Sequence, residues 1–413
     1  MLHAVSLVIV CYVLLRVVPV LPKGRGMRVL LIALLCVAGL KLQAFALLFG
    51  GLASPELPRA VQLVWGWAHG AFILFAGLIL LRDVLLLLRH VWCLAVRVPD
   101  IPLAGRMSGM PEQTGTIMLF RQRRPTLFAF MEASDIVLRQ WLLPALLLAC
   151  VSALWGVWQA CAVPEVRTVN MLVRQLPAGL EGLRVVQLSD MHVSALLRRP
   201  WVEAVVRRVN ELQPDIIVLT GDMVDGKPDL RAQDVAPLAE LRAHYGVWAC
   251  LGNHEYYADV RGWQVALRKL GIQVLRNAHV TLTLAGGRVT LAGVTDRVAL
   301  RWPERALPAP DAAEALRGAP QNVFTLLLAH RPAEAEAASR AGVDLQLSGH
   351  THGGQLWGLA PLVGWFNGGF SRGEYVVNGM NLYISNGAGL WPGFPLRVGV
   401  PSEITEVVLH SDN

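Results

Sequence analysis

Long apolar runs dominate the amino-terminal part of the chain. Four stretches of about 20 mostly apolar residues each have the length needed to cross a bilayer core of roughly 30 Å as an α-helix. They comprise residues 2–21, 29–50, 61–81 and 141–163. The pattern predicts a transmembrane region of about four helices over residues 1–163, followed by a second domain over residues 164–413.

Short apolar runs replace the long ones after residue 164. Five are rich in Val, Ile and Leu and have the length of buried strands; they are residues 184–189, 215–220, 247–251, 323–328 and 343–347. We also expect amphipathic helices at 202–212, 260–270 and 333–341, a hairpin over 280–293, and strands at 374–377, 382–385 and 404–409. Residues 296–320 are expected to be the least regular stretch. This order of elements predicts an α/β domain with an antiparallel contribution from its carboxyl third.

A polar cluster follows each of the five short apolar runs. The clusters are Asp190-Met191-His192, Gly221-Asp222-Met223-Val224-Asp225, Gly252-Asn253-His254-Glu255, the single residue His330, and Gly349-His350-Thr351-His352. Side chains that lie just past the carboxyl ends of parallel strands meet at one edge of a sheet. We therefore expect these clusters to form one site.

The residue types in the clusters are those of a metal centre. Carboxylate oxygens, imidazole nitrogens and an amide carbonyl suit Mn, Fe, Zn or Mg, and no Cys is among them to indicate a structural zinc site. Two cations about 3.5 to 4 Å apart need a bridging carboxylate, for which Asp222 is the best candidate. Any one of these His residues is more often a hydrogen-bonded structural residue, but five clusters in this order favour a two-metal site.

The order of the clusters, D-x-H, G-D-x-x-D, G-N-H-[DE], H and G-H-x-H, resembles that of the calcineurin-like metallophosphoesterases over roughly residues 164–410. The resemblance implies a four-layer αββα metallophosphoesterase sandwich that binds two divalent metal ions. It also implies which residues bind them. The first metal would take Asp190, His192, Asp222 and His352, and the second Asp222, Asn253, His330 and His350.

Two further residues acquire roles from the same resemblance. His254 corresponds to a histidine that binds no metal and instead protonates the leaving oxygen of a phosphoester. Asp225 would orient the His254 imidazole and stabilise its charge. The expected partner of the site is therefore a phosphoester substrate, hydrolysed by water that the metals activate.

Shorter strings narrow the resemblance to a membrane-associated bacterial phosphodiesterase branch, often described as YkuE-like or YaeI-like. These strings are Leu188-Ser189-Asp190-Met191-His192, Gly349-His350-Thr351-His352-Gly353-Gly354-Gln355, Pro395-Leu396-Arg397 and Pro401-Ser402-Glu403-Ile404. The expectation that follows is a multi-pass protein of the bacterial inner membrane that hydrolyses phosphodiester or pyrophosphate bonds, with a lipid-linked molecule as an attractive substrate.

Composition and charge agree with a membrane protein. The mean hydropathy is +0.45 and only 16% of residues are charged, which is less than soluble domains carry. Arg and Lys gather in the loop after residue 21 and in residues 82–140, so the positive-inside tendency orients the carboxyl domain outside the cytoplasm. The net charge of +7 has no aromatic-basic motif beside it, and no nucleic-acid binding is expected.

Two alternatives remain at this point. One is a pyrophosphatase of the lipid A pathway that acts on a UDP-2,3-diacylglucosamine-type substrate, which would require the domain to face the cytoplasm. The other is a non-enzymatic sensor or scaffold that retains the metal fold. The complete ligand set and the presence of His254 argue against the second alternative.

Overall fold

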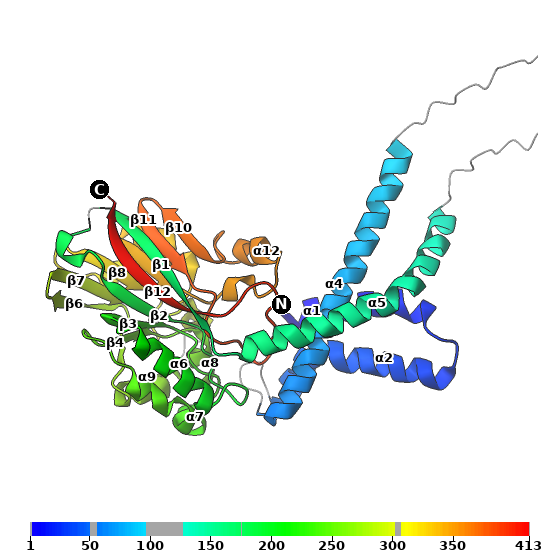
Figure 1. Cartoon of the computed structure of the whole chain (residues 1–413), viewed down its shortest axis with the longest axis horizontal. Coiled ribbons are helices and arrows are strands. Elements are labelled where there is room, and N and C mark those ends of the chain that lie inside the picture. The colour runs from blue at the N-terminus through cyan, green and yellow to red at the C-terminus, as the bar shows by residue number, and fades with distance from the viewer. Residues whose placement is uncertain (1, 50–55, 96–126, 175, 302–306, 413) are drawn as a thin grey trace, which may run out of the picture.

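The computed structural model describes residues 2–49, 56–95, 127–174, 176–301 and 307–412. An elongated group of helices from the first part of the chain lies beside a compact α/β sandwich formed by the rest (Figure 1). Of the Arg- and Lys-containing stretch 82–140, residues 96–126 lie outside the described residues.

The first five α-helices are apolar along most of their length. They are α1 (Leu2–Val17), α2 (Arg25–Gly39), α3 (Lys41–Phe49), α4 (Arg59–Ala95) and α5 (Leu127–Cys161). Within the described residues, three helices are long and apolar enough to cross a membrane, or four if α2 and α3 count as one span. Helices α4 and α5 are longer than the sequence pattern predicts, and α4 continues through the apolar segment after Asp83.

The predicted helix over residues 29–50 is divided into α2 and α3, which are bent by 64°. The hydroxyl of Ser6 donates a hydrogen bond to the carbonyl of Gly39 at 3.1 Å, at the end of α2. A Cβ at Gly39 would lie 2.5 Å from a methyl carbon of Val10, so this point of the chain is pressed against α1. Polar competition for a carbonyl beside a glycine is a usual cause of a sharp bend.

Two six-stranded mixed sheets form the centre of the sandwich (Figure 1). The first has the order β1-β12-β2-β3-β4-β5, with β1 (Glu165–Arg174), β12 (Glu403–Asp412), β2 (Arg184–Leu188), β3 (Ile216–Thr220), β4 (Val247–Cys250) and β5 (Gln273–Val274). The second has the order β10-β11-β9-β8-β7-β6, with β10 (Gly373–Val377), β11 (Met380–Ile384), β9 (Leu345–Ser348), β8 (Phe324–Leu328), β7 (Gly287–Gly293) and β6 (Ala278–Leu284).

Parallel pairing dominates the middle of each sheet. Strands β2 to β5 are parallel to one another, as are β7, β8, β9 and β11. Antiparallel pairs join β12 to β2 and place β6 and β10 at the edges of the second sheet. The predicted α/β class with two kinds of pairing is confirmed, and the sequence patterns missed β1.

Helices cover the outer faces of the sheets. One apolar core joins the first sheet to α6 (Arg199–Glu211) and α9 (Val260–Lys269), a second lies between the sheets, and a third joins the second sheet to α11 (Ala335–Arg340). The shorter helices are α7 (Pro228–Val235), α8 (Asn253–Ala258), α10 (Ala312–Ala315) and α12 (Ala360–Trp365). The stretch 296–320, expected to be irregular, contains a 3-10 turn over Arg297–Arg301 and α10, and residues 302–306 lie outside the described part.

The loop over residues 391–398 of the sandwich packs against the helices. The amide of Arg397 donates to the carbonyl of Gly156 in α5 at 3.0 Å, and the ammonium of Lys41 in α3 donates to the carbonyl of Pro392 at 3.0 Å. Leu396 is fully buried and shares an apolar cluster with Ala71 of α4. The helices therefore pack directly against a loop of the sandwich.

Gly156 provides a test of this packing. A Cβ there would lie 2.6 Å from a methyl carbon of Leu396 and 3.0 Å from the carbonyl oxygen of Arg397, whereas a Cβ at Gly77 of α4 meets nothing within 4 Å. Gly156→Ala should lower the free energy of unfolding by about 1–3 kcal/mol, the usual cost of overpacking. Thermal unfolding in detergent measures it; Gly77→Ala is the control and should not destabilise. Equal stability of the two variants would contradict the contact.

Candidate metal centre

Loops at the carboxyl ends of parallel strands in both sheets supply the predicted site residues. Asp190 follows β2, Asp222 follows β3 and Asn253 follows β4, while His330 and His350 follow β8 and β9. Backbone hydrogen bonds join these loops, because the amide of Asp190 donates to the carbonyl of Gly221 and the amide of His192 to that of Asp222.

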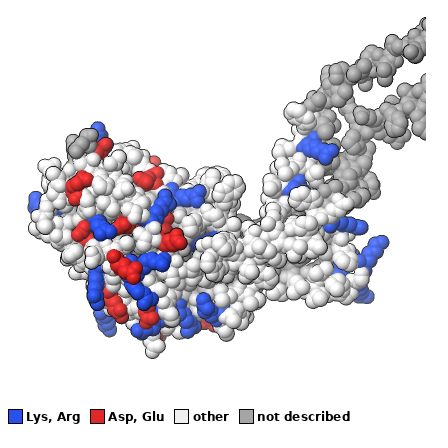
Figure 2. Space-filling view, viewed as in Figure 1, with Lys and Arg blue, Asp and Glu red and all other residues white. Residues whose placement is uncertain are grey.

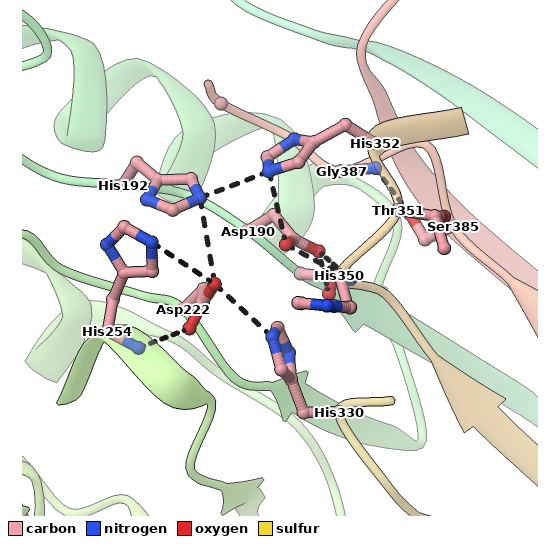
Figure 3. A network of polar contacts seen from close by, with 12 residues as sticks. Asp190, His192, Asp222, His254, His330, His350, Thr351, His352, Ser385 and Gly387 are labelled. Atoms are coloured by element: carbon pink, nitrogen blue, oxygen red, sulfur yellow. Dashed lines mark hydrogen bonds and ion pairs between the residues drawn. The ribbon is translucent and has the colours of Figure 1, made fainter. Parts of the chain in front are cut away.

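The backbone at the site is strained. Five of the predicted ligands have φ between 45° and 71°, a region that favours glycine; they are Asp190, His192, Asp222, His350 and His352. Such conformations cost of order 1–3 kcal/mol each and persist where surrounding contacts impose them, often at functional sites. Here they turn side chains from several loops toward one point (Figure 3).

Asp190, His192 and His352 form one potential metal-binding group, with ligand atoms that all lie within 4.8 Å of one another. The Nε2 atoms of His192 and His352 are 3.2 Å apart, and Nε2 of His352 is 3.5 Å from Oδ1 of Asp190. Figure 3 shows the two imidazoles turned toward each other above the carboxylates.

Asp222, His330 and His350 form a second potential group with the same 4.8 Å limit. Oδ2 of Asp222 lies 3.2 Å from Nε2 of His330 and 3.9 Å from Nε2 of His192, which belongs to the first group. This carboxylate thus stands between the two groups (Figure 3), where a bridging ligand would have to be.

The hydrogen bonds that His330 and His192 make on the side away from the centre show whether these rings could bind cations. Nδ1 of His330 donates to the carbonyl of Thr220 at 2.8 Å, and Nδ1 of His192 donates to Oδ2 of Asp225 at 3.2 Å. Each ring therefore presents the lone pair of Nε2 to the centre, as metal-binding histidines usually do. The buried Nε2 of His330 faces Oδ2 of Asp222, at 3.2 Å. These donors fit divalent cations.

Charge leads to the same conclusion. Burial holds the pKa of His350 and His352 well below its usual range, so both rings are neutral. Burial alone would raise the pKa of Asp222, but the neighbouring His330 and His254 hold it well below its ordinary value. Ionised carboxylate and neutral imidazole are the protonation states that a metal ion requires. His330 differs: burial alone would lower its pKa, but Asp222 and Asp190 raise it to about 10, so a bound cation would have to displace a proton from this ring.

His254 lies beside the two groups and forms a third potential group with His192 and Asp225. Its Nδ1 donates to Oδ1 of Asp225 at 2.5 Å, and its backbone amide donates to Oδ1 of Asp222 at 2.8 Å. Burial alone would lower the pKa of His254, but Asp222 and Asp225 outweigh it and raise the pKa to about 9. Asp225 contacts His192 as well as His254, so it positions one ring of the first potential metal-binding group and the ring of His254. The sequence predicted only its contact with His254.

Arg331 complicates the second group. Its guanidinium donates to Oδ1 of Asn253 at 2.9 Å and lies 2.8 Å from Nε2 of His350, while Nε bonds Asp296 at 2.8 Å. Asn253 and His350 therefore point at a positive charge that the sequence did not indicate. A cation bound by these two ligand atoms requires the guanidinium to move away from them.

Two buried charged residues brace the loops and were also missed as site residues. The carboxylate of Glu255 accepts hydrogen bonds from the amides of Asp222, Met223, Val224 and Gly252. Its place three residues after Gly252, at the start of α8, is the signal of a capping box. Arg397 donates to the carbonyls of Asn386 and Gly389 at 2.6 and 2.8 Å and has no comparable local signal.

Known proteins resemble this chain in sequence. The family model of the calcineurin-like phosphoesterases matches residues 183–354. A "transmembrane protein with metallophosphoesterase domain" of Danio rerio is 37% identical over 273 residues, covering 64% of this chain and 62% of that protein. Its namesake from Bos taurus is 32% identical over 355 residues, covering 83% of this chain and 78% of that protein. The "uncharacterized metallophosphoesterase YkuE" of Bacillus subtilis is 34% identical over 253 residues, covering 58% of this chain and 82% of that protein. The match with the Danio rerio protein spans less than two thirds of that protein's length.

Asp222 and His254 should have separable effects. Asp222→Asn replaces the carboxylate between the two groups with an uncharged amide. The variant should lose both bound metal and hydrolysis of a chromogenic phosphodiester. His254→Ala should keep the metal and lower turnover by roughly 10²- to 10⁴-fold, the usual size of a general-acid contribution. Metal analysis of both purified variants, with turnover, decides this. An active Asp222→Asn protein that retained two metals would contradict the assignment.

Proposed function

The chain belongs to the calcineurin-like phosphoesterase family, and on that premise we propose that it hydrolyses phosphodiester or pyrophosphate bonds of lipid-linked substrates at a membrane with two divalent metal ions. That it is a metal-dependent hydrolase of phosphoric esters follows from the family and its metallophosphoesterase relatives. The observation that carries the two-metal proposal is the Asp222 carboxylate between two groups of potential ligands.

In the proposed centre, Asp190, His192 and His352 would hold one ion, His330, His350 and Asn253 would hold the other, and Asp222 would serve both. The bound ions would supply an activated water molecule and neutralise charge on the phosphoryl oxygens. Asp225 fixes the ring of His254 through Nδ1, which leaves Nε2 to carry the proton. His254 then donates that proton to the leaving oxygen.

We propose that the helices α1, α2 with α3, α4 and α5 cross a membrane, with the sandwich outside the cytoplasm. Lys41 and Arg59 donate to the sandwich carbonyls of Pro392 and Leu196, but the other Lys and Arg side chains that Figure 2 shows on the helical part lie at its end remote from the sandwich. Arg16 and Arg82 pair there with Asp83, at 2.8 and 2.7 Å, and Arg25 begins α2. Basic residues concentrate on the cytoplasmic side of membrane proteins, which supports this orientation.

A lipid-linked substrate is supported by the neighbourhood of the site. The ring of Trp391 lies 6.3 Å from that of His254, centroid to centroid. Trp391 belongs to the 391–398 loop that packs on Gly156 and Lys41. The catalytic histidine is thus separated from the apolar helices by one loop, so a substrate held in the bilayer lies close to the reacting atoms. The relatives that are named as transmembrane proteins come from animals and YkuE from a bacterium, so they support a membrane as the location, while the bacterial inner membrane stays a proposal.

Substrate class is tested with the full chain reconstituted in vesicles and loaded with Mn²⁺. We expect hydrolysis of a soluble chromogenic phosphodiester and faster hydrolysis of a diester or pyrophosphate held in the same vesicles, because confinement to the bilayer raises proximity. Asp222→Asn is the control for contaminating activity. Turnover of phosphomonoesters or phosphopeptides alone would contradict the proposed substrate class.

Orientation is tested with reporters fused after Asn413 in a bacterial host. Alkaline phosphatase, which works outside the cytoplasm, should be active there, and green fluorescent protein exported by the same route should be dark. Protease added to spheroplasts should digest the sandwich. Fluorescence together with full protection from protease would place the domain in the cytoplasm, as the lipid A pathway alternative requires.

A further inference from the structure

We infer that residues 356–366 form a membrane-docking surface that lies in the headgroup region of the bilayer next to the metal centre. This inference rests on the proposed function, since it requires the helices to span a membrane. It goes further because it gives a part of the sandwich itself direct contact with lipid.

The 356–366 segment exposes large apolar side chains. Trp357 is 81% exposed, Trp365 79% and Phe366 60%, although each has a side chain that would normally be covered. No charged residue occurs between Gln355 and Arg372. A contiguous exposed apolar surface of this kind marks a site of interaction with a protein or a membrane.

Continuity with the helices favours the membrane as the occupant. Leu356, the first residue of the segment, is buried in an apolar cluster with Ala71 of α4 and Ala153 of α5. At 1.5 Å per residue, Ala71 lies roughly 18 Å from the start of α4 and Ala153 roughly 12 Å from the end of α5. The segment therefore begins against the sandwich-side halves of α4 and α5, and Figure 1 shows α12 on the side of the sandwich turned toward the helices.

The chemistry of the segment also fits a bilayer interface. Tryptophan concentrates at that level of membranes because its ring is apolar and its N–H is polar. Trp155 and Trp158 near the sandwich end of α5 are themselves 55% and 58% exposed. Tryptophans from α5 and from the 356–366 segment would together form an aromatic belt. Arg372, exposed just after the segment, can reach lipid phosphates.

Hydrogen bonds hold the segment beside the 391–398 loop and hold Ser371, just past the end of the segment, beside the metal-binding residues 350–352. The hydroxyl of Thr351, between His350 and His352, donates to the carbonyl of Ser371 at 2.5 Å. The amide of Trp357 donates to the carbonyl of Val398 at 2.8 Å. Docking of the segment would therefore set the height of the metal centre above the lipid phosphates, which matches a phosphoester near the headgroup.

The test uses an environment-sensitive fluorophore on a single cysteine. The full chain, with its six natural cysteines replaced by serine, carries Trp365→Cys or, separately, Phe366→Cys, and is reconstituted in phosphatidylcholine–phosphatidylglycerol vesicles. At both positions we expect blue-shifted emission that nitroxide lipids labelled near the headgroup quench strongly and aqueous iodide does not. Val265→Cys on α9 is the matched control, because Val265 is an exposed apolar residue (54%) away from the helices; iodide should quench it.

Each other outcome overturns the inference. Quenching of both probes by iodide, as at Val265→Cys, would mean that the surface faces water. Protection from iodide and from nitroxide lipid together would mean that a second protein copy covers it. Neither readout uses turnover, so a failed inference can be told apart from a failed proposed function, which the Asp222→Asn and vesicle assays report separately.

Discussion

The burial of two carboxylates at one point is the constraint on which the rest of the structure depends. Asp190 is fully buried and Asp222 is 2% exposed, and an uncompensated buried charge is very costly. Burial raises the pKa of Asp190, because the ionised carboxylate has lost its contact with water. The carboxylate therefore needs positive charge nearby to stay ionised. Divalent ions would satisfy that demand, and the neutral rings of His350 and His352 could bind them without adding charge.

Folding the chain around such a centre requires bracing by residues that are not ligands. The carboxylate of Glu255 gathers four amides from the loops after β3 and β4, and Arg397 gathers carbonyls from the loop after β11. Asp225 holds His192 and His254 on one carboxylate. Because these groups satisfy the buried backbone, the left-handed conformations of the ligands can persist.

The strand pattern and the polar clusters could be predicted because each is a local signal: a short apolar run followed directly by its cluster. The sequence therefore predicted the residues of the two groups that flank the Oδ2 atom of Asp222, although their roles as metal ligands stay predictions. The position of β1 beside β12, the bend at Gly39 and the contact of Arg331 with Asn253 were not predictable in this way. Each depends on partners distant in sequence or on a competition among side chains that no local pattern records.

The helical part is larger than a tether requires, and its contact with the sandwich suggests a reason. One spanning helix already gives effectively irreversible insertion. Here α3, α4 and α5 all reach the 391–398 loop, which in turn carries Trp391 toward His254 and Arg397 toward the loops of the metal centre. Since rigid packing transmits small displacements, the position of that loop is determined by both parts of the chain. The helices therefore pack against the loop that borders the candidate site, which is a contact that a simple tether would not need.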